Sequence, residues 1–238
     1  MNLLKYKASV RHTENTLGED YFVGDIQGNY YLLFDGLNKN GFNFAKDRLF
    51  CVGDLVDKGP ESELCLSLLK EPWFFSVLGN HDLYFIKAVY DLSFRKQYLD
   101  TYGSWSASLL AEQDKSEGIA SLMKLRMPLS RTIDSKVRVG VGHACFPTDI
   151  DVALKATYTD DLVSEITSTR ALFENTEHSI DNIDIVFLGH NSVDEIIKSN
   201  NILWLDTIHT GLLSIITLDD ALNHHQTTNN LSELQYDR

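Results

Sequence analysis

Short apolar runs that end in a glycine and a polar residue are the feature that most constrains this chain. The runs are YFVGD (21–25), LFCVGD (49–54), FFSVLGNHD (74–82), VRVGVGH (137–143) and DIVFLGH (184–190), and ILWLDT (202–207) repeats the plan without the glycine. Runs of this length, rich in β-branched and aromatic residues and bounded by glycine, predict buried strands.

Helix-like segments separate these predicted strands. They cover residues 29–40 and 61–70 and a longer stretch from Asp82 to about Met127, which breaks near residues 100–106. Such alternation predicts the α/β fold class, with a largely central sheet and the longer stretch as a helical cap on one edge. LLSIITLDD (212–220) is expected to form a hairpin with ILWLDT. We expect a single domain over residues 1–238, with a polar, loosely held tail over about 219–238.

The composition narrows the classes of partner. Apolar residues make up 43% of the chain and the net charge is −13, which argues for a folded protein and against binding to nucleic acid or anionic membranes. Three cysteines are too few and too scattered for a disulfide framework or a zinc cluster. The sequence has neither the apolar core of a signal peptide nor a membrane-spanning run. We therefore expect a cytoplasmic protein.

Residues able to bind metal ions or move protons follow the predicted strands. Ligands of open α/β sheets bind at the carboxyl ends of the strands, and these ends carry Asp25, Asp54, Asn80, His81, His143, His190 and Asp206. A single residue of this kind is more often a turn, a helix cap or a core side chain. A set that mixes carboxylate, amide and imidazole groups is typical of a site for two divalent metal ions.

The same residues lie in motifs that resemble a known family. GDIQG (24–28), GDLVDKGP (53–60), GNHD (79–82), GHACFP (142–147), FLGHNS (187–192) and WLDT (204–207) occur in this order. They resemble the motifs of the phosphoprotein phosphatase family of metallophosphoesterases, especially its bacteriophage and bacterial members. The likeness runs from about Tyr21 to Leu218 and includes GSW (103–105). It implies a calcineurin-like fold, a central β-sandwich flanked by helices.

The resemblance also implies a role for each matching residue. Two divalent ions, Mn²⁺ with Fe²⁺ or Mg²⁺ as alternatives, would be held by Asp25, Gln27, Asp54, Asn80, His143 and His190. Asp54 would bridge the ions, and a hydroxide between them would attack phosphorus. His81 would protonate the leaving oxygen, with Asp57 orienting its imidazole. The phosphate would be bound by Asn80, Lys58 and Arg170.

Three of these positions depart from the family pattern. Gln27 stands where the family has histidine, so the first metal ion is expected to bind less tightly, and activity to be weakened. Lys58 replaces an arginine and loses the bidentate contact to phosphate. Arg170 is the one arginine between the GHACFP and FLGHNS motifs, and its spacing to His190 is shorter than the family's.

The sequence therefore predicts an enzyme that hydrolyses phosphate monoesters in a metal-dependent reaction. Phosphoserine and phosphothreonine in proteins are the expected substrates, and phosphotyrosine is a further candidate. One alternative is a symmetrical dinucleoside tetraphosphate hydrolase. The other is a weakened phosphatase fold that binds phosphoproteins without turning them over; Gln27 and Lys58 favour it, and the intact remaining motif residues argue against it.

Overall fold

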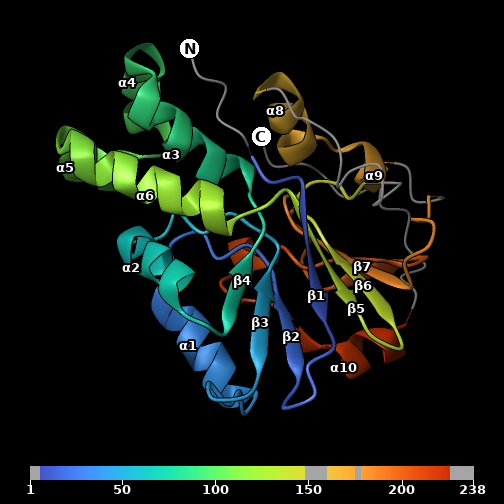
Figure 1. Cartoon of the computed structure of the whole chain (residues 1–238). Coiled ribbons are helices and arrows are strands. Elements are labelled where there is room, and N and C mark those ends of the chain that lie inside the picture. The colour runs from blue at the N-terminus through green and yellow to red at the C-terminus, as the bar shows by residue number, and fades with distance from the viewer. Residues whose placement is uncertain (1–5, 148–159, 175–177, 226–238) are drawn as a thin grey trace.

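Two β-sheets pack face to face in the computed structural model, which describes residues 6–147, 160–174 and 178–225 (Figure 1). The four-stranded sheet contains, in spatial order, β10 (Ile215–Thr217), β2 (Asp20–Val23), β3 (Arg48–Cys51) and β4 (Phe74–Ser76). The six-stranded sheet contains β1 (Ser9–Thr13), β5 (Ser130–Asp134), β6 (Arg138–Val141), β7 (Ile185–Leu188), β9 (Ile202–Trp204) and β8 (Ile197–Ser199). The sandwich implied by the resemblance is confirmed.

Helices cover the outer sides of the sandwich. The first ones are α1 (Tyr30–Lys39), α2 (Ser62–Ser67) and the 3₁₀ turn η1 (Leu68–Lys70). A helical cap follows, which we define as α3 (Asn80–Tyr90), α4 (Leu92–Thr101), η2 (Ser104–Ser106), α5 (Ala107–Ala111) and α6 (Gln113–Arg126), and its helices stand together at the top of Figure 1. The remaining ones are α8 (Asp160–Ser168), α9 (Ala171–Glu174), η3 (Ile208–Thr210) and α10 (Leu218–Asn223). None of the helices described is long and apolar enough to cross a membrane.

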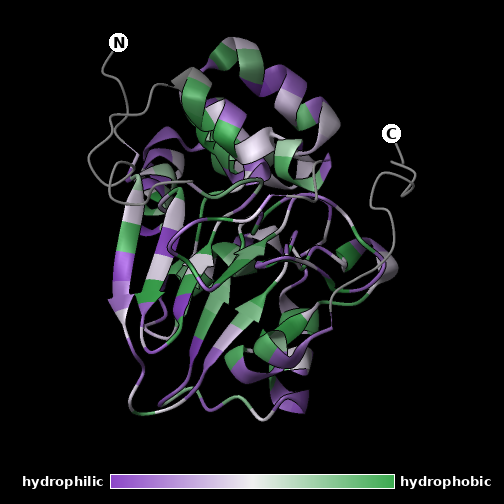
Figure 2. Ribbon diagram, turned by 90° about the vertical axis from the view of Figure 1, so that its right-hand side faces the viewer, coloured by the Kyte–Doolittle hydropathy of each residue, from purple (hydrophilic) through white to green (hydrophobic). Residues whose placement is uncertain are grey.

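Aromatic side chains fill the space between the two sheets. Phe22 on β2 and Phe187 on β7 are fully buried, and their rings stack with centroids 3.9 Å apart. Phe50 on β3 extends this stack, with its ring centroid 5.7 Å from that of Phe22. Figure 2 shows hydrophobic residues along the strands in the middle of the molecule, where these side chains lie. The contact joins the sheets because each contributes rings that would otherwise be exposed to water.

Parallel pairing brings the ends of the motif-bearing strands to one edge. In the four-stranded sheet, Val23 pairs with Cys51 and Cys51 with Ser76, so β2, β3 and β4 end side by side. In the six-stranded sheet, β6, β7 and β9 are parallel as well. The polar loops that follow these six strands therefore meet at the rim of the sandwich, as the strand-end rule predicts.

Two predictions about the C-terminal part are wrong. LLSIITLDD does not form a hairpin with ILWLDT, because β10 pairs antiparallel with β2 in the other sheet, while β9 pairs with β7 and β8. The tail is not loosely held from residue 219, because α10 continues to Asn223 and buries Ala221 completely. Thr217 caps this helix by accepting a hydrogen bond from the Asp220 amide. Residues 226–238 of the predicted tail lie outside the described residues.

The stacked rings between the sheets should be a main source of stability. Phe187→Ala is expected to lower the free energy of unfolding by about 3–5 kcal/mol, because it removes apolar contacts and leaves a cavity. Tyr31→Ala is the control, because the Tyr31 side chain is 62% exposed, and it should change stability by less than about 0.5 kcal/mol. Urea unfolding of both variants measures the difference, and equal stabilities would contradict the assignment of the core.

Candidate active site

The loops after β2 and β3 are joined by backbone hydrogen bonds that place Asp25 beside Asp54. The amides of Ile26 and Gln27 both donate to the Asp54 carbonyl, at 3.1 and 2.7 Å, and the Gly28 amide donates to the Leu55 carbonyl at 2.9 Å. Gln27 and Asp54 have positive φ angles of 45° and 49°. Left-handed backbone is costly for residues other than glycine and tends to cluster at functional sites.

Two buried carboxylates and an imidazole converge at this rim. Asp25, Asp54 and His143 are buried, and each offers a ligand atom within 4.8 Å of the others. Burial, and then the negative charges of Asp206 and Asp54, raise the pKa of Asp25 well above its usual value. Burial also acts to raise the pKa of Asp54, but His143 and His81 hold it below the usual value. The site therefore concentrates negative charge that a cation would stabilise.

The hydrogen bonds of His143 and His190 indicate which ring nitrogens are available to a metal ion. Nδ1 of His143 lies 2.8 Å from the Val52 carbonyl, and Nε2 of His190 lies 3.2 Å from the Ser168 carbonyl. Since a carbonyl only accepts, those two nitrogens carry the hydrogens in the neutral rings. Burial, followed by the charge of His143, lowers the pKa of His190 to about 3, so His190 is neutral near pH 7.

When both rings are neutral, the other nitrogen of each ring presents a lone pair. His143 Nε2 and His190 Nδ1 both lie 3.0 Å from Oδ1 of Asn80, and Asp54 Oδ1 lies 3.4 Å from His143 Nε2. With the amide in this orientation, these electron-rich atoms face one another without a hydrogen between them. A divalent cation is the group that such a donor set fits, and its mixture of oxygen and imidazole suits Mn²⁺ or Fe²⁺.

Glycines allow the backbone to approach the two carboxylates. A side chain at Gly79 would overlap the Asp54 carboxylate, and one at Gly189 would overlap the Asp25 carboxylate. The His190 amide, next to Gly189, donates to both oxygens of Asp25 at 3.3 Å. The glycines that follow β4 and β7 are thus required by this close packing.

His81 and Asp57 form a buried dyad beside the metal-ligand set. Nδ1 of His81 lies 2.8 Å from Oδ2 of Asp57, and the His81 amide donates to Asp54 Oδ1 at 3.0 Å. The other oxygen of Asp57 accepts hydrogen bonds from the Tyr98 hydroxyl and from Trp105 Nε1, each at 2.7 Å. Asp57 itself has a φ of 73° and is fully buried. The arrangement can orient an imidazole for proton donation.

A cleft of about 350 Å³ is lined in part by the loops that follow β2 and β3. Its lining includes Gln27, Lys58 and His209. Lys58 is exposed, lines the cleft and has a φ of 59°, in the left-handed region. Gln27 is buried except for 4% of its surface. His209 Nε2 lies 3.0 Å from Oδ1 of Asp194, which gives this histidine a surface partner.

Arg170 lies at the periphery of the same site. It is exposed, directly precedes α9, and its positive charge is one of the influences that lower the pKa of His190. The predicted site residues therefore lie at one rim of the sandwich. They are Asp25, Gln27, Asp54, Asp57, Lys58, Asn80, His81, His143, Arg170 and His190.

Sequence reasoning missed several residues of this region. Asp206 ends one of the predicted strands but received no role, and it is buried beside Asp25, with Ser192 donating to its Oδ2 at 3.1 Å. Its Oδ1 has no hydrogen-bond partner among the described residues. Tyr98 gave no motif signal, and aromatic density made a core position the simpler interpretation of Trp105.

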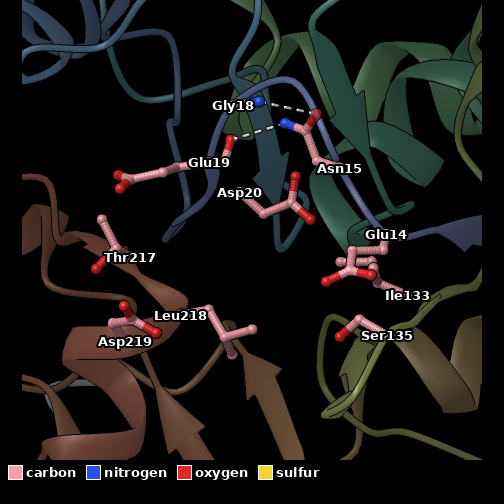
Figure 3. A pocket seen from close by; sticks show the side chains of 10 residues that line it. All are labelled: Glu14, Asn15, Gly18, Glu19, Asp20, Ile133, Ser135, Thr217, Leu218 and Asp219. Atoms are coloured by element: carbon pink, nitrogen blue, oxygen red, sulfur yellow. Dashed lines mark hydrogen bonds between the residues drawn. The ribbon is translucent and has the colours of Figure 1, made fainter.

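A second pocket, of about 170 Å³, lies at the opposite end of β2 (Figure 3). Asp20 begins β2 and lines this pocket, whereas Asp25 follows the end of the strand. Glu14, Glu19 and Asp219 also line it, and Arg48 forms an ion pair with Asp20 at 2.7 Å. It contains none of the motif residues, so we assign the chemistry to the first site.

A family model supplies the deciding comparison. The model for the calcineurin-like phosphoesterase domain matches residues 21–205, which includes most strands of both sheets and every predicted site residue from Asp25 to His190. The chain belongs to the calcineurin-like phosphoesterase family. The predicted family resemblance and the prediction of a phosphoesterase are confirmed.

The chain is similar in sequence to two kinds of enzyme, protein phosphatases and dinucleoside tetraphosphatases. Serine/threonine-protein phosphatase 2 of Escherichia coli K12 is 29% identical over 189 residues, covering 79% of this chain and 86% of that protein. The symmetrical bis(5'-nucleosyl)-tetraphosphatase of Dechloromonas aromatica is 50% identical, but over 68 residues that cover 28% of this chain and 25% of that protein.

Solved structures support the same fold. A crystal structure provisionally assigned as a diadenosine tetraphosphatase has a TM-score of 0.65 and 25% identity, covering 91% of this chain and 96% of that one. The cold-active protein-tyrosine phosphatase of a psychrophilic Shewanella has a TM-score of 0.60 at 14% identity, covering 89% of this chain and 79% of that one, and this likeness concerns the fold alone.

Substitution of Asp25 should raise the stability of the metal-free protein and reduce the stabilisation that Mn²⁺ provides. Because the folded-state pKa of Asp25 is raised, the metal-free fold loses stability as the pH rises through that pKa. Asp25→Asn removes the buried charge and should stabilise the protein in EDTA by about 1 kcal/mol, while reducing the stabilisation that Mn²⁺ provides. Thermal unfolding near pH 7.5, with and without Mn²⁺, measures both effects.

Asp100→Asn is the matched control for this prediction. Asp100 is an exposed carboxylate paired with Lys96 in the cap, so its neutralisation should leave both melting temperatures nearly unchanged. If Asp25→Asn destabilised the protein in EDTA as well, the carboxylate cluster would not be an electrostatic burden on the metal-free fold.

Proposed function

We propose that this phosphoesterase hydrolyses phosphate monoesters of proteins, with phosphoserine and phosphothreonine as its main substrates. The observation that carries the proposal is the convergence of lone pairs from His143, His190 and Asn80 next to two buried carboxylates, with a histidine–aspartate dyad alongside. Its protein-phosphatase relatives match most of their own length, which favours a protein substrate. Cytoplasmic location stays a prediction.

The proposed ligands divide into two sets that share Asp54. Asp25 and Gln27 would hold the first ion with Asp54, and Asn80, His143 and His190 would hold the second, Mn²⁺ being the expected metal. When bound, such ions supply an activated water at neutral pH and polarise the phosphoryl oxygens. Gln27 gives the first set a neutral amide where imidazole would bind more strongly, so we expect the two sets to differ in affinity.

His81 would act as the proton donor. Its Nδ1 is held by Asp57, which leaves Nε2 on the opposite side of the ring for the leaving group. As the P–O bond breaks, the electron pair stays on the leaving oxygen, which takes the proton from Nε2. Asp57 would keep the imidazole in one orientation throughout.

Lys58, Arg170 and the Asn80 amide would bind the phosphate. Lys58 lines the cleft from a loop with left-handed backbone, and Arg170 lies close enough to His190 for its charge to act there. These cations and the metal ions offset the charge of an acidic protein, which would otherwise repel a dianionic substrate.

Symmetrical dinucleoside tetraphosphate hydrolysis is the second candidate. It is favoured by the likeness to the structure assigned as a diadenosine tetraphosphatase and by the short match to the Dechloromonas enzyme. Lys58 and His209 are the basic side chains that line the described cleft, and His209 is paired with Asp194, which is little charge for a polyphosphate. Comparing kcat/KM for a phosphoserine peptide and for diadenosine tetraphosphate decides between the two substrates.

The metal requirement should respond to residue 27. In p-nitrophenyl phosphate hydrolysis, Gln27→His is expected to lower the Mn²⁺ concentration for half-maximal rate by about tenfold, because imidazole is the stronger ligand. Titration of Mn²⁺ into both EDTA-treated proteins measures the shift. If neither protein released phosphate at any Mn²⁺ concentration, the catalytic proposal would fail for this substrate, and a binding module would become the better interpretation.

The phosphate contact should improve when the lysine is changed to arginine. Lys58→Arg is expected to lower KM for p-nitrophenyl phosphate about threefold to tenfold, because guanidinium can bind phosphate through two parallel hydrogen bonds. Lys58→Met should raise KM instead. Steady-state kinetics at saturating Mn²⁺ provide the values, and unchanged KM in both variants would show that Lys58 does not contact the substrate.

A further inference from the structure

We propose that Tyr98 and Trp105 of the helical cap are positioning residues for the proton-donation step. They would hold the Asp57 carboxylate, and through it the His81 imidazole, in the one orientation that serves the leaving group. This inference rests on the proposed function, since it concerns the same dyad.

The two oxygens of Asp57 have different hydrogen-bond partners, one in the cap and the other at His81. Oδ1 accepts from the Tyr98 hydroxyl and from Trp105 Nε1, each at 2.7 Å, whereas Oδ2 lies 2.8 Å from Nδ1 of His81. Rotation of the carboxylate would break both bonds to Oδ1 in a site where Asp57 is fully buried. Because unpaired buried donors are costly, the two cap residues fix the oxygen that faces His81.

Neither cap residue can exchange its role from donor to acceptor. The indole Nε1–H of Trp105 only donates hydrogen bonds. Burial, followed by the neighbouring charge of Asp57, raises the pKa of Tyr98 far above its usual value, so its hydroxyl keeps its hydrogen. Asp57 Oδ1 therefore accepts two hydrogen bonds from the cap.

The turn after α4 is built to bring both donors to the same oxygen. The amides of Tyr102 and Gly103 both donate to the Tyr98 carbonyl, at 2.9 and 2.8 Å, which ends the helix. A side chain at Gly103 would overlap the Tyr98 ring, so glycine allows the chain to turn back across it. The Trp105 ring then stacks on Phe85 of α3 at 5.5 Å between centroids, which fixes the indole.

A purely structural role would have a different signature from a positioning role. If the two hydrogen bonds merely anchored the cap, their loss would reduce turnover of every substrate alike. If they orient the proton donor, their loss should matter most where the leaving oxygen needs a proton. Phenolate is a basic leaving group, whereas p-nitrophenolate is a stabilised anion that leaves without one.

The experiment compares phenyl phosphate with p-nitrophenyl phosphate at saturating Mn²⁺. Tyr98→Phe keeps the ring and removes one donor, and it should lower kcat for phenyl phosphate about tenfold but kcat for p-nitrophenyl phosphate less than about twofold. Trp105→Phe should act in the same direction. Tyr21→Phe is the control, because the Tyr21 hydroxyl donates to the Asn40 carbonyl at 3.2 Å, away from the dyad, and both rates should stay unchanged.

A second variant tests whether Tyr98 acts through Asp57. In an Asp57→Asn background, adding Tyr98→Phe should leave the ratio of the two rates unchanged, because the carboxylate that Tyr98 orients is already gone. Melting temperatures of all variants separate lost positioning from lost folding.

Each outcome bears on one of the two proposals. An equal loss for both substrates, no loss for either, or a ratio that still responds to Tyr98→Phe in the Asp57→Asn background would overturn the positioning role while leaving the proposed function intact. Absence of Mn²⁺-dependent turnover in the unmodified protein would overturn the proposed function, and the positioning role with it.

Discussion

Repulsion between buried carboxylates is the constraint around which this molecule is organised. Asp25 and Asp54 lie where the ends of both sheets meet, in surroundings that favour neutral groups. Leaving like charges unpaired there would cost more than the neighbouring hydrogen bonds return. The positive φ angles of Gln27, Asp54 and His190 are further costs at the same place. A bound cation would offset these costs, and His143 and His190, whose ring nitrogens both lie 3.0 Å from Oδ1 of Asn80, are among its proposed ligands.

Two of the three departures from the family pattern lie together. Gln27 and Lys58 line the same cleft, whereas Asn80, His143 and His190 match the pattern, and Arg170 lies near His190. The proposed site is therefore asymmetric, with a strong set of ligands near the dyad and a weaker set at the cleft. Such asymmetry leaves the histidine–aspartate dyad intact, because His81 and Asp57 bind each other rather than the cleft residues.

The sequence predicted the motif-bearing strands and the residues that the structure brings together at the rim of the sandwich, because each lies next to a strong local signal. Glycine after an apolar run marks both the strand end and the close approach that the carboxylates require. The signal was absent for β1 and β5, because their sequences SVRHT and SRTID are polar. Arg131 of β5 is nevertheless buried, and it donates a hydrogen bond to the Ser76 carbonyl. The partner of β10 could not be deduced either, since pairing with β2 across the chain depends on the assembled sandwich. Tyr98 was missed for the same reason: its contact with Asp57 spans 41 residues. The single-domain assignment stays a prediction.

The hydrogen bonds between the cap and Asp57 also make proton donation by His81 depend on local opening of the cap. The cap contributes Tyr98 and Trp105 to a dyad whose aspartate lies in the loop after β3, so the dyad bridges two parts of the fold. Helical segments of this size open more readily than the centre of a sandwich. Local unfolding of α4 and the turn after it would break the hydrogen bonds from Tyr98 and Trp105 to Asp57 while the sheets stayed folded. His81 would then lose its orientation at a temperature below that of global unfolding. Activity would therefore be lost on heating before the sheets unfold.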